Sequence, residues 1–236
     1  MNTLSASRAD MDAPRRALVW DAPVRVFHWL LALSFAIAWL TAEGESWRLV
    51  HVTAGYTVAG LVAFRIVWGL VGSRHARFAD FVRGPRAVAS YVGSLLRGRP
   101  DHHAGHNPAG ALAIVALLAL AALTAASGWA AYTDVGGEWL EDVHEALANT
   151  MLAVVVLHVV AVLASSWLHR ENLVGSMIHG RKAVPESEGI RRPRRGLAVL
   201  LLVAVLGFWA LQWQSAPAGG WLPGASGSHR TDDDDD

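Results

Sequence analysis

The sequence predicts an all-α membrane protein: a four-helix transmembrane bundle followed by a fifth, C-terminal transmembrane helix. Of its 236 residues, 53% are hydrophobic and only 17% are charged, which is more apolar than an ordinary soluble domain of this size. Five apolar runs occur, at about 24–41, 50–71, 109–132, 143–168 and 197–213. Each is near the roughly 20 residues needed to cross a hydrocarbon core. The 11 Trp against 3 Tyr fit a protein with many aromatic anchors at the membrane surface.

The runs differ in the polar residues that they carry. The first has His28 near its start, the second has His51 near its start and Arg65 further in, and the fourth contains both His144 and His158. The third is predicted from its apolar length alone. The fifth, LAVLLLVAVLGFWALQW, is free of charge. Runs two and four are therefore more than simple apolar anchors.

The charges between the runs alternate in sign and predict the orientation. Basic residues fill the N-terminal tail and the second and fourth connections: Arg8, Arg15, Arg16 and Arg25; Arg74, Arg77, Arg83, Arg86, Arg97 and Arg99; Arg170, Arg181, Lys182, Arg191, Arg192, Arg194 and Arg195. Acidic residues dominate the other two connections: Glu43 and Glu45 with a lone Arg48, then Asp134, Glu138, Glu141 and Asp142. The positive-inside rule places the N-terminus in the cytoplasm and the C-terminal tail outside. The N-terminus lacks the pattern of a removable signal peptide.

His144 and His158 are the most informative pair. Fourteen residues of helix bring two side chains to the same face, about 21 Å apart along the axis. Ionisable groups within a membrane are costly, which suggests a function for them. With the predicted orientation, His51 and His144 lie near the external surface, whereas His28 and His158 lie in the cytoplasmic half.

Two histidines at each of two depths suit the axial ligation of two b-type haems, one above the other. A single membrane histidine is often only a hydrogen-bonding group between helices, but four that pair by depth make this reading less favourable. A zinc site would need three or four ligands at one depth. The chain has no cysteine, which excludes thiolate ligation, iron–sulfur clusters and covalent haem attachment, so the haem would be held non-covalently.

Three neighbouring residues are further candidates for contact with the haems. Gly55 follows His51 by one turn and would let a porphyrin edge approach, although helix packing explains a glycine nearly as well. Arg65 is fourteen residues after His51, and Arg25 precedes His28 by three. Either arginine could pair with haem propionates, and the alternative for Arg25 is a charge that extends to the membrane surface.

The remaining histidines carry weaker signals. A small cluster in RGRPDHHAGHNPAG could bind a metal, but a polar loop rich in Gly and Pro is the more favourable interpretation; its members are His102, His103 and His106. No role is predicted for His75, His169, His179 and His229.

Four segments resemble the bacterial di-haem cytochrome b family, which includes the prokaryotic cytochrome b-561 proteins and the b-type cytochrome subunits of nickel–iron hydrogenases. They are VRVFHWLLALSF, HVTAGYTVAGLVAFRIVWGLVG, GHNPAGALAIVALL and VHEALANTMLAVVVLHVVAVLASSWLHRENLVGSMIHGRK, within about residues 18–184. The resemblance implies haem ligation by the same four histidines. The family pattern also has Arg65 with Trp68 and Gly69, and HNPAG before the third helix.

The resemblance further implies a bacterial inner-membrane protein that exchanges electrons between the quinone pool and a partner. That partner would be a hydrogenase, another dehydrogenase or a c-type cytochrome. The chain then divides into a cytoplasmic tail (1–17), the di-haem domain (18–184), a basic linker (185–196), the fifth helix (197–213) and an external acidic tail (214–236). The five aspartates that end the tail are usually just solvated, and the alternative is a docking segment for a basic partner.

An electron-transfer subunit is therefore favoured over a self-sufficient enzyme. One alternative is a stand-alone oxidoreductase that oxidises superoxide at the outer face and reduces quinone, although no catalytic constellation points to it. A non-redox membrane anchor or metal transporter is a second, but transporters generally have internal repeats and broken helices, which are not evident here. Basic loops are explained by orientation and anionic lipid, and no feature indicates nucleic-acid binding.

Overall fold

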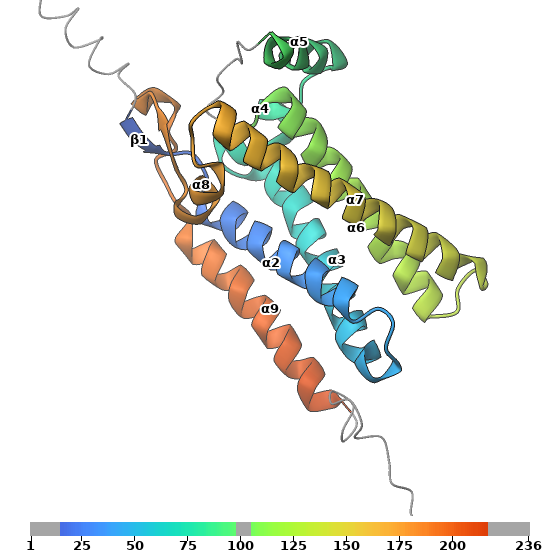
Figure 1. The fold of residues 1–236 in the computed structure, drawn as a ribbon. Helices are drawn as coiled ribbons and strands as arrows, with labels where there is room; N and C mark the ends of the chain where they lie inside the picture. Colours follow the sequence, from blue (N-terminus) through green and yellow to red (C-terminus); the bar gives the residue numbers. More distant parts are fainter. Residues whose placement is uncertain (1–14, 98–104, 217–236) are drawn as a thin grey trace, which may run out of the picture.

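The computed structural model describes residues 15–97 and 105–216. Five long helices run side by side (Figure 1): α2 (Ala22–Leu40), α3 (Arg48–Val71), α6 (Pro108–Tyr132), α7 (Trp139–Leu168) and α9 (Arg195–Ser215). All five are long and apolar enough to cross a membrane. The predicted all-α bundle with a fifth C-terminal helix is confirmed. The aspartates at the C-terminus lie outside the described residues.

The helices pack in the spatial order α9, α2, α3, α6, α7. The backbone of α7 packs closely along α6. In the described residues it does not pack as closely against α2 or α3. Side chains make the connection, as in the core cluster in which Met151 of α7 meets Val58 and Val62 of α3 and Ala121 of α6. The histidine-bearing helices α2 and α3 therefore face α7 across side chains and not across closely packed backbones.

Polar caps define where two of the spans begin. The Asp21 carboxylate accepts the backbone N–H of Val24 at 2.9 Å at the start of α2, and Pro23 stands in the first turn. The Asn107 side chain likewise accepts the N–H of Gly110 at 2.7 Å, directly before Pro108. A capping side chain satisfies an N–H that the helix leaves unpaired, and proline costs nothing in the first turn.

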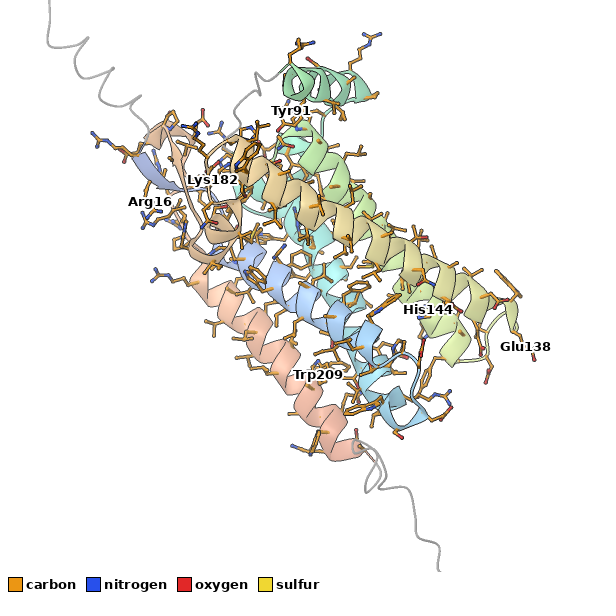
Figure 2. The ribbon with its side chains drawn as sticks, viewed as in Figure 1. Arg16, Tyr91, Glu138, His144, Lys182 and Trp209 are labelled. Atoms are coloured by element: carbon orange, nitrogen blue, oxygen red, sulfur yellow. The ribbon has the colours of Figure 1, made fainter. Side chains whose placement is uncertain are left out.

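The end of the bundle that carries the N-terminus and the arginine-rich connections, here called the basic end, bears a small layer of short elements. These are β1 (Arg15–Leu18), η2 (Arg74–Ala76), α4 (Phe78–Phe81), α5 (Pro85–Leu96), α8 (Leu173–His179), β2 (Arg181–Val184) and η3 (Glu186–Glu188). The opposite, acidic end has η1 (Glu45–Trp47) and the turn before α7. Figure 2 places Arg16 and Lys182 at the basic end and Glu138 at the acidic end.

The antiparallel pairing of β1 with β2 was not predicted. The segment Arg15–Leu18 crosses the expected boundary between the N-terminal tail (1–17) and the di-haem domain (18–184), and it forms the first strand. Lys182 of β2 is buried and its ammonium group lies 3.3 Å from the Glu171 carboxylate. The strands bring together segments about 166 positions apart, so local sequence pattern does not reveal them.

The start of the fourth span also differs from the prediction. Glu141 and Asp142 were assigned to a loop, but α7 already begins at Trp139 and both lie in its first turn. Negative charges are favourable there because the N-terminal end of a helix carries a partial positive charge. The extra turn places His144 firmly on a helix.

Candidate functional site

His51 of α3 and His144 of α7 lie against each other. Their ring centroids are 6.1 Å apart and the ring planes are nearly perpendicular, at 86°. In Figure 2, His144 lies between the two ends of the bundle and nearer to Glu138. The structure therefore brings together the two histidines that the sequence assigned to one depth.

The two rings are held in the same way. Nδ1 of His51 lies 2.8 Å from the carbonyl oxygen of Ala38 on α2, and Nδ1 of His144 lies 2.9 Å from that of Thr124 on α6. A carbonyl only accepts, so each Nδ1 carries the proton and donates it. Nε2 of both rings has no protein hydrogen-bond partner among the described residues, which leaves it free for a metal.

These observations fit the axial ligands of a haem iron. Metal-bound histidines almost always donate their other N–H to a carbonyl, carboxylate or water, which orients the ring. His51 and His144 would hold the iron through Nε2, the nitrogen that their carbonyl contacts leave free.

Two glycines border this pair. A Cβ added at Gly128 of α6 would lie 2.7 Å from Cε1 and 2.9 Å from Nδ1 of His144, so only glycine leaves room for the ring. A Cβ added at Gly55, one turn after His51, would meet nothing within 4 Å. The space beside His51 is thus open on the side where the sequence predicts a porphyrin edge.

His28 and His158 form the second candidate pair, on α2 and α7. In contrast to His51 and His144, the two rings make no ring contact with each other in the described residues. Nδ1 of His28 is buried without a hydrogen-bond partner, and its ring meets Trp29 edge-on with centroids 5.1 Å apart. A buried ring nitrogen without a hydrogen-bond partner costs free energy of folding. A bound group that supplies a partner or reorients the ring would remove that cost.

Arg65 is buried at the same end of the bundle, with a relative exposure of 3%. Its guanidinium carbon lies 4.9 Å from the ring centre of Phe78 and 5.9 Å from that of Phe81. One of its terminal nitrogens, Nη1, is buried without a partner. Nη1 of this buried guanidinium is thus a donor available to a carboxylate-bearing group such as a haem propionate.

Arg25 is engaged differently. Its Nη1 donates to the carbonyl of Ile178 in α8 at 2.5 Å, whereas its Nε is buried without a partner. The side chain thus ties α2 to the small layer at the basic end, and it keeps one donor for another group.

His106 is a site residue that sequence analysis assigned to a polar loop. Its ring packs against Trp20, with centroids 4.5 Å apart, and against Phe81 at 4.7 Å. Desolvation, followed by the positive charge of Arg65, lowers the pKa of His106 to about 3. The imidazole is therefore neutral and belongs to the same cluster as Arg65. Its position directly before the Asn107 cap is the one local signal that it is held in place.

A buried polar link stabilises the start of α2 beneath this cluster. Asp21 is fully buried, and its second carboxylate oxygen accepts the indole N–H of Trp68 on α3 at 3.0 Å. The Trp68 ring stacks on Phe64, with centroids 6.2 Å apart and planes 11° apart. Trp68 therefore has a structural role at the end where Arg65 and His28 lie.

The other described histidines have structural partners. His75 Nε2 lies 2.7 Å from the Glu188 carbonyl, His169 Nδ1 lies 2.9 Å from the Ser165 carbonyl, and His179 Nδ1 accepts the N–H of Arg181 at 3.0 Å. His102, His103 and His229 lie outside the described residues. Within the described parts of the chain, no group of three or more His, Asp or Glu side chains is placed to hold a metal ion.

Comparison with known proteins adds an independent finding. The family model for prokaryotic cytochrome b561 matches residues 19–180, which includes all four histidines but not α9. Curated relatives are named "Probable Ni/Fe-hydrogenase B-type cytochrome subunit". The protein from Rhodobacter capsulatus is 26% identical over 76% of this chain and 87% of its own length. The protein from Azotobacter vinelandii is 27% identical over 69% of this chain and 86% of its own length. No solved structure matches.

Proposed function

The chain belongs to the prokaryotic cytochrome b561 family, and we propose that it carries electrons across the membrane by means of two non-covalently bound b haems. His51 and His144 hold one haem, and His28 and His158 hold the other. A bound b haem supplies a one-electron iron couple whose potential depends on its ligands and surroundings.

The arrangement of His51 and His144 is the observation that carries the proposal. The ring centroids of two imidazoles from different helices lie 6.1 Å apart. Each ring is oriented by a backbone carbonyl that its Nδ1 contacts, that of Ala38 on α2 or of Thr124 on α6, and this leaves Nε2 as the nitrogen that would bind iron. The interhelical hydrogen bonds of the two rings use only Nδ1, and they do not account for the close approach of the two imidazoles to each other.

The protein's own groups then have distinct tasks. The Ala38 and Thr124 carbonyls select the tautomer of each ring and increase its basicity. Arg65, buried with an unpaired Nη1, offers a positive charge to a propionate of the second haem. His144 and His158 are fourteen positions apart on α7, about 21 Å along the axis, so the two pairs occupy different depths of the membrane.

We further propose that the basic end faces the cytoplasm of a bacterial cell, and that the chain works as a subunit between quinone and a redox partner. The alternation of basic and acidic connections supports the orientation. The names of the relatives favour a hydrogenase as the partner, with another dehydrogenase or a c-type cytochrome as the alternatives. The helix α9 lies outside the matched region.

Reconstitution into sealed vesicles tests the transfer itself. The vesicles contain trapped ferricyanide, and a quinol analogue is added outside. In wild-type vesicles the protein should take electrons from the quinol and pass them to the ferricyanide. The reduced protein should have the spectrum of a b-type cytochrome. His51→Ala should abolish the crossing, whereas Gly60→Ala, where an added Cβ meets nothing within 4 Å, should not. Protein that purifies colourless from haem-replete cells, or His51→Ala vesicles that transfer electrons at the wild-type rate, would contradict the proposal.

A further inference from the structure

The basic end contains a pocket outside the histidine sites. It has a volume of about 330 Å³ and lies between η2 and the start of α9. Four arginines line it, Arg74, Arg191, Arg192 and Arg194, together with Ser73. Such a volume is at the small end of ligand sites. The lining therefore favours a compact anion.

Of the four arginines in this pocket, Arg74 donates to the Ser187 carbonyl at 3.4 Å, and the other three are available to an anion. Within the described residues, no carboxylate lies within ion-pair distance of Arg191, Arg192 or Arg194. The hydroxyl oxygen of Ser73 is buried without a hydrogen-bond partner. Two glutamates of η3, Glu186 and Glu188, precede the pocket but do not line it. Uncompensated guanidinium groups beside a free hydroxyl donor are the groups that bind a phosphate.

The loop that carries these arginines is held at both ends, so the pocket is formed before a ligand binds. The N–H of Ile190 donates to the Leu18 carbonyl at 2.7 Å, and the N–H of Ala22 donates to the Pro193 carbonyl at 2.9 Å. The first of these bonds joins the loop to β1, and the second joins it to α2. A preformed site lowers the entropic cost of binding.

The place of the pocket in the fold identifies the source of the phosphate. It lies where the membrane span α3 ends and the span α9 begins, at the level of the membrane surface. Beyond it, the outer face of α9 is apolar and exposed, for example at Val199, Leu200 and Val203. A phospholipid whose headgroup occupies the pocket could lay its acyl chains on this face. Basic pockets at this level of membrane proteins bind anionic headgroups.

We propose that this pocket binds the phosphate of an anionic phospholipid and fixes α9 to the bundle at the basic end. The helix also packs on α2 and α3, with Leu197 against the core cluster of Val24, Trp68 and Ala76. Further along it, the Trp209 indole donates to the Thr57 hydroxyl at 2.9 Å. The lipid thus links the part of the chain that matches the family to the helix that lies outside it.

Lipid binding to the full chain, purified in detergent and delipidated, tests the proposal. The probes are phosphatidylglycerol and phosphatidylcholine, and binding is measured by native mass spectrometry and by thermal-shift titration. Each arginine near an anionic headgroup contributes about a fivefold change in affinity, so R191Q/R192Q should raise the dissociation constant for phosphatidylglycerol about 25-fold. Arg86→Gln removes an exposed arginine of α5 that does not line the pocket, and it should change the constant less than twofold.

A second variant keeps the test valid if R191Q/R192Q fails to fold. Ser73→Ala leaves every charge in place and removes the free hydroxyl, so it should weaken phosphatidylglycerol binding about threefold with an unchanged thermal midpoint in phosphatidylcholine. Equal binding of the two lipids, or unchanged binding by both the double variant and Ser73→Ala, would overturn the proposal. Stabilisation by inorganic phosphate as large as that by phosphatidylglycerol would also overturn it, because the site would then bind a free anion.

Discussion

The substitution Gly128→Ala tests the packing that holds His144. The added Cβ would lie 2.7 Å from Cε1 and 2.9 Å from Nδ1 of the ring, where ordinary contact begins at 3.4 Å. The ring must therefore move by about 0.7 Å away from α6, since over-filled sites are relieved by shifts of side chains. The Thr124 carbonyl, which accepts from Nδ1 at 2.9 Å, is on α6 as well, so the same movement stretches that hydrogen bond.

The expected effect on folding is small and the effect on haem affinity is larger. Overpacking costs about 1–3 kcal/mol, and replacing a helical glycine by alanine returns about 1 kcal/mol, which leaves a net loss of up to about 2 kcal/mol in stability. Losing the group that orients a metal-bound histidine lowers metal affinity about 10- to 100-fold. The haem that we propose for His51 and His144 should therefore be lost selectively.

The haem-to-protein ratio and a potentiometric titration of the purified variant measure this. Gly128→Ala should lose one of the two redox components and keep the other at its wild-type potential. Gly60→Ala is the matched control, because the same methyl group there meets nothing within 4 Å. Two components at unchanged potentials in Gly128→Ala would refute the proposed role of the pair.

Three further outcomes are expected. Gly55→Ala should not lower the thermal midpoint of the apoprotein, because its Cβ meets nothing within 4 Å and alanine favours a helix. It should nevertheless lower the haem-to-protein ratio, and an unchanged ratio would mean that no porphyrin lies there. Trp68→Phe should lower the free energy of unfolding in a detergent titration by about 1–3 kcal/mol, since the buried Asp21 carboxylate loses a donor, and an unaltered unfolding curve would contradict this. Burial lowers the pKa of His106 to about 3 in the folded chain, so the unfolded chain binds more protons below about pH 6.5. As the pH is lowered from 6.5 to 3, the free energy of unfolding should therefore fall by up to about 1.4 kcal/mol per pH unit. His106→Gln should remove this part of the pH dependence of the thermal midpoint, and identical profiles would show that His106 titrates normally.

The spans could be predicted from the sequence because a helix in lipid needs a long apolar run and satisfies its own backbone. The helical period places His144 and His158 on one face of α7, and the order of the spans assigns His51 to the level of His144. Their contact in the structure agrees with that argument. Ligation of haem by either pair stays a prediction.

The surroundings of the histidines could not be predicted in the same way. The acceptors for His51 and His144 are backbone carbonyls. Every residue has a backbone carbonyl, so the sequence does not indicate which one will be the acceptor. His106 meets Trp20 and Phe81 from other elements, and the strand Arg15–Leu18 pairs with a segment far along the chain. Each of these depends on tertiary packing, which overrides local pattern.

The haem-to-protein ratio across a set of histidine variants tests the central claim most directly. The account predicts two haems per chain in the wild type, and one in each of His28→Ala, His51→Ala, His144→Ala and His158→Ala. The double variant within a pair, H51A/H144A, should keep one, whereas H51A/H158A should have none. A wild-type ratio of one, or equal ratios in the two double variants, would contradict the pairing of these histidines.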